Sequence, residues 1–262
     1  NPPHYHTVAA AMAYARILNA VLLMGSATPG IEMLAQFEHH TWPVLSLPNR
    51  IASMLPGEAA APLPAAPLMP EIEIVDMRAE LRNGNRSALS LSLKCNLEEV
   101  LKRGEQAILF LNRRGSASYV FCRDCGFVLR CSRCNTQYTW HAGNALLICH
   151  TCNHQRQMPK TCPGCDGVNI RQFGMGTESL EKLVLEAFPS ARTLRWDADT
   201  VRYKGAHDLI LDHFTQHRAD ILIGTQMLSK GLDLPLVTLV GIILADLSLH
   251  LPDFRAAERT FQ

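Results

Sequence analysis

The sequence predicts an α/β protein that carries a cysteine-rich metal-binding insert. Apolar runs of strand length alternate with helical stretches along most of the 262 residues, which is the pattern of a parallel sheet covered by helices. Eight of the nine cysteines form four Cys-x-x-Cys pairs, all between Cys122 and Cys165. Helical and strand patterns continue on both sides of these cysteines, so the cysteine-rich segment interrupts an α/β domain.

The composition is that of a globular protein, with 47% hydrophobic and 19% charged residues. The formal charge of +1 indicates neither a nucleic-acid nor a membrane partner. No apolar run reaches the roughly 18–20 residues needed to span a bilayer, and residues 1–16 lack the apolar core of a signal peptide. The chain begins with Asn1 and ends at Gln262 without a closing loop, which we interpret as a fragment of a longer protein.

The first 46 residues contain the elements of a parallel α/β sheet. Residues 7–19 are alanine-rich without Gly or Pro, which favours a helix. The apolar run 20–24 is expected to be a buried strand that ends at a small-residue turn, 25–29. A second helix is expected over 31–39. Helix, strand, turn and helix in this order indicate a sheet with crossover connections.

Residues 47–90 are expected to be a linker and a lead-in to a second α/β region. The stretch 47–70 contains six prolines and six alanines and favours extended, polyproline-like backbone. A strand-like run at 71–76 follows. The second region then comprises 91–118, the insert 119–172 and the remainder 173–262. Its expected helices are 91–102, the segment that begins at the turn 174–177, and 206–216; its expected strands are 106–111, 193–196, 220–223 and 237–244.

The four cysteine pairs predict two zinc sites. Two thiolates separated by two residues can bind one ion, and two such pairs complete a tetrahedral four-sulfur site. Clustered cysteines without a secretion signal favour zinc over disulfides. Four thiolates leave no open coordination position, so the zinc is expected to be structural rather than hydrolytic. Consecutive and nested pairing of the cysteine pairs both fit the spacing. The ninth cysteine, Cys95, is expected to be an ordinary buried thiol.

Charge gives only weak support for a nucleic-acid clamp in the insert. Six basic and two acidic side chains lie in 119–172, and two zinc–tetrathiolate centres of formal charge −2 each would cancel that excess. Histidines 141, 150 and 154 are expected to be surface residues rather than ligands. Five aromatic residues could either stack bases or form the core of the insert: Tyr119, Phe121, Phe127, Tyr138 and Trp140.

Three further segments present groups suited to ligand or phosphate contacts, although each also has a purely structural interpretation. The turn 25–29 places small and hydroxyl-bearing residues at the end of an apolar run. The segment 224–231 presents hydroxyl, amide and ammonium groups after a strand, or is a capped helix. Arg255 and Arg259 are four residues apart on one helix face, where most such pairs are only solvated.

The order of these motifs resembles the PriA family of primosomal, replication-restart DNA helicases (superfamily 2). The resemblance covers nearly the whole chain and implies two RecA-like lobes that couple ATP hydrolysis to 3′–5′ movement on DNA. It implies the end of lobe one in 1–46, most of lobe two after residue 90, and the inserted double-zinc module. The helicase-motif residues that match are Gly25, Ser26, Ala27, Thr28, Arg113, Arg114, Thr225, Gln226, Lys230, Gly231, Arg255 and Arg259.

The resemblance also implies metal ligands, partners and a compartment. The family's nested sites assign Cys122, Cys125, Cys162 and Cys165 to one Zn²⁺, and Cys131, Cys134, Cys149 and Cys152 to another. The implied partners are forked or single-stranded DNA, primosome proteins and the single-stranded-DNA-binding protein, with no membrane. The implied compartment is the bacterial cytoplasm, and ATP and Mg²⁺ would bind the full-length parent.

The chain departs from the family pattern at the nucleotide site. It contains no G-x-x-x-x-G-K-[ST] loop and no Asp-Glu pair near Asn1, and the arginine-finger segment expected after Gln262 is missing. We therefore expect no complete catalytic set and no ATP hydrolysis by these 262 residues alone. The alternatives are a non-enzymatic zinc-ribbon adaptor that binds nucleic acid or protein, and a rubredoxin-like module that holds iron.

Overall fold

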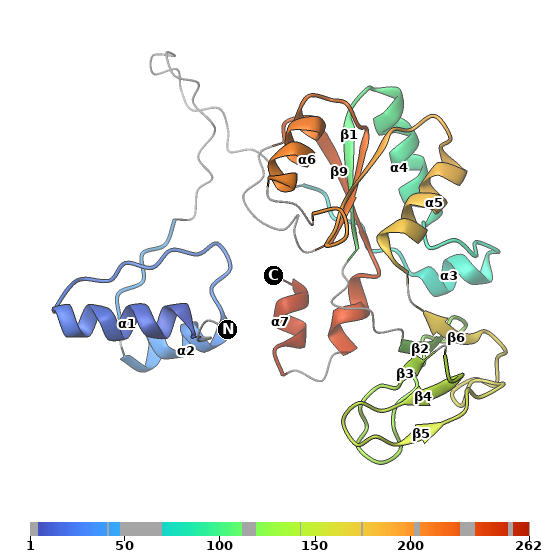
Figure 1. The fold of residues 1–262 in the computed structure, drawn as a ribbon, viewed down its shortest axis with the longest axis horizontal. Helices are drawn as coiled ribbons and strands as arrows, with labels where there is room; N and C mark the ends of the chain where they lie inside the picture. The colour runs from blue at the N-terminus through green and yellow to red at the C-terminus, as the bar shows by residue number, and fades with distance from the viewer. Residues whose placement is uncertain are drawn as a thin grey trace. The chain divides into compact units, whose positions relative to one another are not determined.

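The computed structural model describes residues 5–40, 42–47, 70–111, 119–141, 143–173, 175–201, 205–225, 234–250 and 254–261. It divides into two compact units, residues 1–69 and 70–261. The expectation of an α/β protein with a parallel sheet is confirmed in the second unit (Figure 1).

The first unit contains two helices, α1 (Thr7–Leu18) and α2 (Ile31–His40). The His6 side chain accepts a hydrogen bond from the Ala9 N–H at 3.3 Å and caps the start of α1. The helix ends at Asn19, which adopts the left-handed conformation with φ of 48°. Both helices lie close to the bounds expected from the sequence.

The expected strand at 20–24 is wrong, because this segment is not a strand in the structure. Val21 is 98% exposed and Leu23 is 82% exposed. A strand forms only where a neighbouring strand receives its backbone hydrogen bonds, and no described strand pairs with this segment. The apolar sequence alone therefore does not produce a strand.

The expected strand at 71–76 is wrong for the same reason. Residues 70–76 form no strand, and Ile72 and Ile74 are 80% and 92% exposed. The segment leads into α3 (Met77–Arg82), which is capped by Asp76, whose Oδ1 accepts from the Arg78 N–H at 2.9 Å. Helix α4 (Leu91–Lys102) follows, capped by Ser90, whose hydroxyl accepts from the Leu93 N–H at 3.1 Å.

The core of the second unit is a four-stranded parallel sheet in the order β7-β8-β1-β9. Three of its strands are separated from β1 in sequence by the cysteine-rich module, so the chain leaves the sheet after β1 and returns to it. The bounds of the elements are β1 Gln106–Leu111, α5 Thr177–Ala187, β7 Thr193–Trp196, α6 Ala206–Thr215, β8 Ile221–Gly224 and β9 Val237–Ile243.

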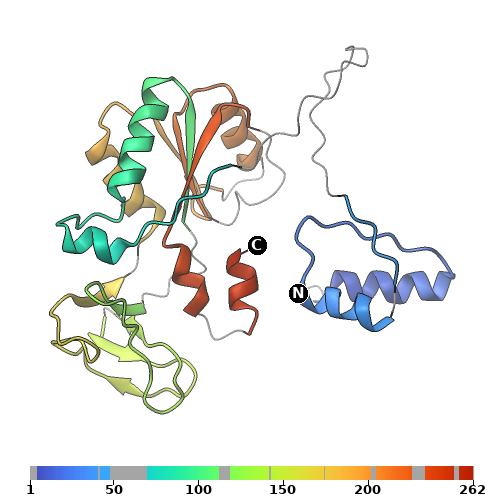
Figure 2. The same cartoon turned by 180° about the vertical axis from the view of Figure 1, so that it is seen from behind.

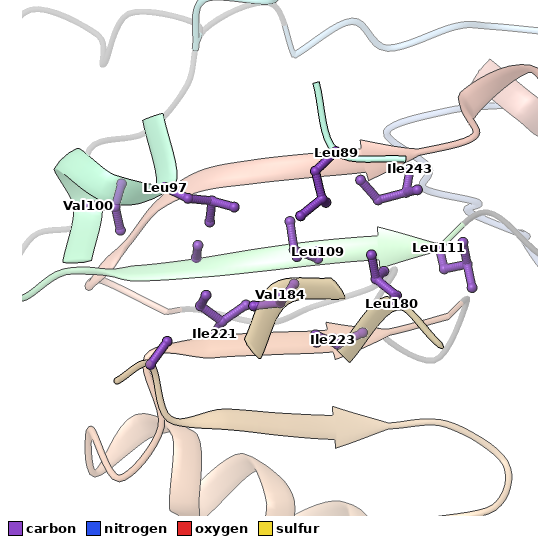
Figure 3. Packing of buried hydrophobic residues seen from close by; sticks show 12 residues of the cluster. Leu89, Leu97, Val100, Leu109, Leu111, Leu180, Val184, Ile221, Ile223 and Ile243 are labelled. Atoms are coloured by element: carbon purple, nitrogen blue, oxygen red, sulfur yellow. The ribbon is translucent and has the colours of Figure 1, made fainter. Parts of the chain in front are cut away.

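Helices cover both faces of this sheet, as Figures 1 and 2 show: α4 and α5 lie on one face and α6 on the other. The larger core lies under α4 and α5 and joins Leu97, Leu109, Val184 and Ile223 (Figure 3). On the other face Phe214 of α6 packs with strand residues and is fully buried. The all-buried pattern of β8 reflects its position between two strands and two layers of helix.

Helix α4 packs closely on the edge strand β9. A Cβ atom added to Gly241 would lie 2.9 Å from Leu93 Cδ1 and 2.8 Å from Leu109 Cδ2. Glycine at this position therefore allows the helix to pack tightly on the strand.

The cysteine-rich module is a five-stranded antiparallel sheet in the order β5-β4-β3-β2-β6. Two short helical segments, η2 and α7, follow β9 at the end of the chain. The bounds are β2 Tyr119–Cys122, β3 Thr139–His141, β4 Leu146–Ile148, β5 Gln155–Arg156, β6 Ile170–Phe173, η2 Ala245–His250 and α7 Ala256–Phe261. Among the helices that the structure describes, none is both long and apolar enough to cross a membrane.

Candidate metal centre

The four Cys-x-x-Cys pairs adopt one repeated turn. In each, the carbonyl of the first cysteine accepts from the N–H four residues later, at 2.8–2.9 Å. Its own N–H donates to the carbonyl five residues later, at 2.7–2.9 Å. Each pair therefore closes into a hairpin-like turn that directs both thiols to one side, as two ligands of one ion require.

The residue after each pair explains why the turn forms. Gly126, Asn135, Asn153 and Asp166 all have positive φ, between 56° and 76°. Glycine, asparagine and aspartate are the residues that tolerate this left-handed conformation best. The sequence thus repeats Cys-x-x-Cys followed by a left-handed residue four times, which makes the position after each pair part of the motif.

The structure brings the pairs together in the nested arrangement. Cys122, Cys125, Cys162 and Cys165 form the first cluster, and Cys131, Cys134, Cys149 and Cys152 form the second, each with all sulfur atoms within 4.8 Å of one another. In the first cluster the Sγ atoms of Cys125 and Cys162 lie 3.6 Å apart. In the second the Sγ atoms of Cys134 and Cys149 lie 3.3 Å apart.

These distances fit a single ion in each cluster. With Zn–S bonds of about 2.3 Å, sulfurs at the corners of a tetrahedron lie about 3.8 Å apart. Iron–sulfur clusters distribute their thiolates over several iron atoms and need wider spacing. Two mononuclear metal ions are therefore compatible with the two clusters, and four thiolates complete a zinc coordination shell with no position left for a substrate.

Thiols this close together do not ionise equally without a cation. Burial raises the pKa of the Cys122 thiol to about 12. In the second cluster burial opposes ionisation, but the N–H groups of Arg133 and Cys134 outweigh it and lower the pKa of Cys131 to about 5. A divalent cation supplies the positive charge that allows all four thiols of a cluster to bind as thiolates.

Polar side chains behind the first cluster fix its turns. Asp124 Oδ1 accepts from Asn169 Nδ2 at 2.8 Å, joining the first turn to the segment after the fourth. Gly167 lies against this pair, since an added Cβ would be 2.3 Å from Asp124 Oδ2. The backbone Arg123 N–H donates to the Asn169 carbonyl at 3.1 Å.

The second cluster is supported by an aromatic residue of the module core. Tyr138 is fully buried, and its hydroxyl is hydrogen-bonded to His154 Nδ1. His154 Nδ1 lies 3.9 Å from Cys131 Sγ, in contact with the cluster but outside its ligand set. His141 and His150 pair with each other, Nε2 to Nε2 at 3.1 Å, and also lie outside both clusters.

Among the aromatic residues of the module, Tyr138 belongs to the core, whereas Phe127 is 37% exposed. The expectation that Cys95 is a buried thiol is wrong, because Cys95 lies on an exposed position of α4. The buried face of that helix is formed by Leu97 and Val100, and Cys95 is not on it.

The residues of the expected helicase motifs lie in both units. In the first unit the segment 25–28 forms a turn in which the Ser26 hydroxyl accepts from the Thr28 N–H at 3.2 Å. In the second, Thr225 follows β8 at the carboxyl end of the sheet, and Arg255 and Arg259 flank the first turn of α7. Five of the expected residues lie outside the described part of the chain: Arg113, Arg114, Gln226, Lys230 and Gly231.

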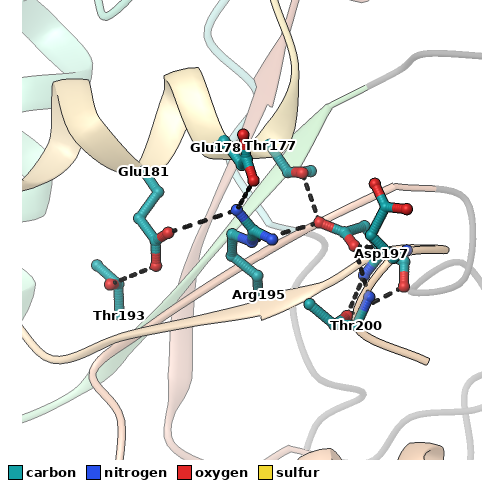
Figure 4. A network of polar contacts seen from close by, with 8 residues as sticks. Thr177, Glu178, Glu181, Thr193, Arg195, Asp197 and Thr200 are labelled. Atoms are coloured by element: carbon teal, nitrogen blue, oxygen red, sulfur yellow. Dashed lines mark hydrogen bonds and ion pairs between the residues drawn. The ribbon is translucent and has the colours of Figure 1, made fainter. Parts of the chain in front are cut away.

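A polar network at the carboxyl end of β7 was not singled out from the sequence (Figure 4). Asp197 is only 6% exposed; it accepts from the Thr177 hydroxyl and from the N–H groups of Asp199 and Thr200. Arg195 Nε lies 3.4 Å from Asp197 Oδ2. Burial alone would raise the pKa of Asp197, but these donors and the Arg195 charge lower it.

This network lies next to the expected motif residue Thr225. The Thr225 N–H donates to the carbonyl of Trp196, the residue before Asp197. Thr177 begins α5, so Asp197 joins the start of that helix to the loop after β7. An aspartate directly after a strand and a threonine at a helix start were the available sequence signals, but neither reveals that the two residues meet.

The parallel sheet and the two tetracysteine clusters define an α/β protein with an inserted module that can hold two metal ions. No protein-family model matches the chain. Among curated proteins it is 46% identical over 260 residues to the Replication restart protein PriA of Bacillus subtilis, which covers 99% of this chain and 31% of that protein. The PriA of Synechocystis is 42% identical over 268 residues, and that of Haemophilus influenzae 35% over 259.

The chain spans about a third of the length of the curated relatives it matches. Its homologues are replication restart proteins named PriA, and the matches are those expected of a fragment of such a protein. They favour a replication restart protein over the zinc-ribbon adaptor considered from the sequence.

Proposed function

We propose that this chain is the central part of an ATP-dependent 3′–5′ DNA helicase that restarts stalled replication forks and assembles the primosome. The observation that carries the proposal is the similarity to PriA proteins over nearly the whole chain. The parallel sheet interrupted by two tetracysteine clusters supports it. The proposed divisions are the end of RecA-like lobe one (1–46), a linker (47–90), the start of lobe two (91–118), the insert (119–172) and the remainder of lobe two (173–262).

In the full-length parent, the carboxyl edge of the sheet would face nucleotide and DNA. Thr225 lies at that edge, and Gln226 and Lys230 follow it in sequence. We propose that these three residues couple the nucleotide state to DNA contacts, and that the segment 25–28, Arg113, Arg114, Gly231, Arg255 and Arg259 belong to the other helicase motifs. ATP and Mg²⁺ would bind residues outside these 262, because the chain contains neither a phosphate-binding loop nor an acidic box.

We propose that the two clusters bind structural Zn²⁺. Such sites can contribute about 10–16 kcal/mol of apparent binding free energy, which a module of this size needs in order to fold. The module would then present a surface to DNA or to primosome proteins, with the single-stranded-DNA-binding protein a further proposed partner. The proposed compartment is the bacterial cytoplasm.

The test compares the full-length protein that contains these residues with its Lys230→Ala variant. DNA-stimulated ATP hydrolysis and fork unwinding are expected in the full-length protein and are expected to be lost in the variant. Lys182→Ala, a change of an exposed lysine on α5, serves as the matched control and should retain both activities. The isolated 262 residues are expected to hydrolyse no ATP, and DNA-stimulated turnover by them would contradict the assignment.

A further inference from the structure

Two arginines join the cysteine-rich module to the segment that precedes α4. The Arg123 guanidinium, which belongs to the first cluster's turn, donates from Nη1 to the Arg86 carbonyl at 2.9 Å. In the second contact the arginine belongs to the other partner: Arg78 of α3 approaches the module at Gly126, the residue directly after Cys125. A Cβ atom added to Gly126 would lie 3.4 Å from Arg78 Cδ and 3.8 Å from Arg78 Nη1.

The Arg78 guanidinium is held in place at this junction. Asp76 binds it with two contacts, Nε to Oδ1 at 3.0 Å and Nη2 to Oδ2 at 3.2 Å. The pKa of Arg78 is raised mainly by the hydrogen bond to Asp76 and by the charge of that carboxylate. A cation therefore lies beside Gly126, the residue that follows Cys125 of the first cluster.

Metal loading fixes the charge that Arg78 meets. One Zn²⁺ bound by four thiolates carries a formal charge of −2. The filled first cluster therefore attracts the Arg78 guanidinium. The Arg123 contact differs in kind, because its acceptor is a neutral carbonyl whose charge does not depend on the metal.

We propose that Arg78 is a positioning residue that docks the module on residues 77–86 by its attraction to the metal-loaded first cluster. The second cluster does not take part in this docking. The proposal requires metal in the first cluster but does not depend on helicase activity, so the two can fail separately. The Arg78 side chain is 56% exposed to solvent. Its attraction to the first cluster is therefore expected to stabilise the docking only slightly and to weaken as salt is added.

A charge-only change tests this docking in the zinc-loaded chain. Cys165→His keeps a zinc ligand at this position but reduces the formal charge of the first centre from −2 to −1. Cys152→His makes the same change in the second cluster. Arg78→Gln removes the cation, and Arg82→Gln removes an exposed arginine of the same helix as a control. Millisecond hydrogen exchange of residues 77–86, followed by mass spectrometry, reports the docking, with zinc content measured on each sample.

Cys165→His and Arg78→Gln are each expected to accelerate exchange at 77–86 by roughly two- to five-fold. Their combination should be no faster than Arg78→Gln alone, and Cys152→His and Arg82→Gln should leave exchange unchanged. Raising the salt to about 1 M, where the screening length is about 3 Å, should bring the unaltered chain to the rate of Arg78→Gln. Arg123→Gln should accelerate exchange equally at low and high salt.

Additive effects of Cys165→His and Arg78→Gln would overturn the proposal, as would an equal effect of Cys152→His. If Cys165→His binds only one zinc, the salt series on the unaltered chain and on Arg78→Gln decides the question. Exchange in the unaltered chain that does not respond to salt would then rule out an electrostatic contact.

Discussion

The sulfur atoms of Cys122 and Cys165 lie 3.7 Å apart although 43 positions separate the two residues in the chain. The first and last Cys-x-x-Cys turns therefore share one cluster, and the second cluster lies within the loop that they close. A metal ion bound by both turns would close this long loop and so restrict the unfolded chain. The first cluster thus ties together the two ends of the module where it joins the parallel sheet domain.

Paired cysteine substitutions distinguish the nested from the consecutive arrangement. Replacing Cys122 and Cys165 together by Ser should reduce the zinc content from two ions per chain to one, because both residues belong to the first cluster. Replacing Cys122 and Cys131 together should remove both ions. Consecutive pairing predicts the opposite results for the two double variants. Metal analysis, with the absorption of the Co²⁺-substituted chain, measures the number of intact sites.

Gly167→Ala is expected to destabilise the module by about 1–3 kcal/mol, because the new Cβ would meet the Asp124 carboxylate at 2.3 Å. The chain must then move Asp124 away from Asn169 and distort the first cluster. Competition with a chelator should show weaker zinc binding at one of the two sites. Gly143→Ala is the matched control, since nothing lies within 4 Å of that position. Equal zinc affinity in both variants would contradict this role of Gly167.

Gly241→Ala should lower the free energy of unfolding of the parallel sheet domain by about 1–3 kcal/mol. The added methyl group would lie 2.9 Å from Leu93 and 2.8 Å from Leu109, so α4 would have to move away from β9. Leu93→Ala removes one of these obstacles. The double variant should therefore lose less stability than the sum of the two single changes, which urea unfolding can measure. Strict additivity would show that α4 and β9 do not pack as described.

The sheet domain is expected to lose stability below about pH 4 through Asp220, which joins the starts of β7 and β8. Arg192 binds both oxygens of this carboxylate, and the hydrogen bond lowers the pKa of Asp220 below its usual 3.8. The folded state therefore binds the proton more weakly than the unfolded state. The stabilisation is complete above the unfolded pKa and is lost as the pH falls through the folded pKa.

Asp220→Asn should reduce this acid sensitivity and cost about 1–3 kcal/mol at neutral pH. The fluorescence of Trp196, in a chain whose other tryptophans are replaced by Phe, reports unfolding of the sheet domain separately from acid release of zinc. Asp208→Asn changes an exposed carboxylate of α6 and should leave the acid transition unchanged. An identical acid transition in Asp220→Asn and the unaltered chain would exclude Asp220 as its cause.

Local patterns predicted most elements of the sheet domain within a residue or two. The helix expected at 91–102 and the strands expected at 106–111 and 193–196 have those bounds in the structure. Their apolar periodicity coincides with burial, because each has a partner within the same unit. The two expected strands that are wrong, 20–24 and 71–76, have equally suitable residues, but no described strand pairs with either segment. A strand is a property of a pair of segments, and one segment cannot reveal whether the other is present.

The sequence alone determined that this protein has eight metal-competent thiols, arranged as four turns, within an α/β chain. That information is local, because Cys-x-x-Cys followed by Gly, Asn or Asp specifies its own turn. Only the tertiary structure decided which turns share a cluster, that Asp197 meets Thr177, and that Arg78 lies beside Gly126. Each of these contacts joins residues far apart in the chain, and their pairing depends on how the strands and helices pack, which residue spacing does not encode.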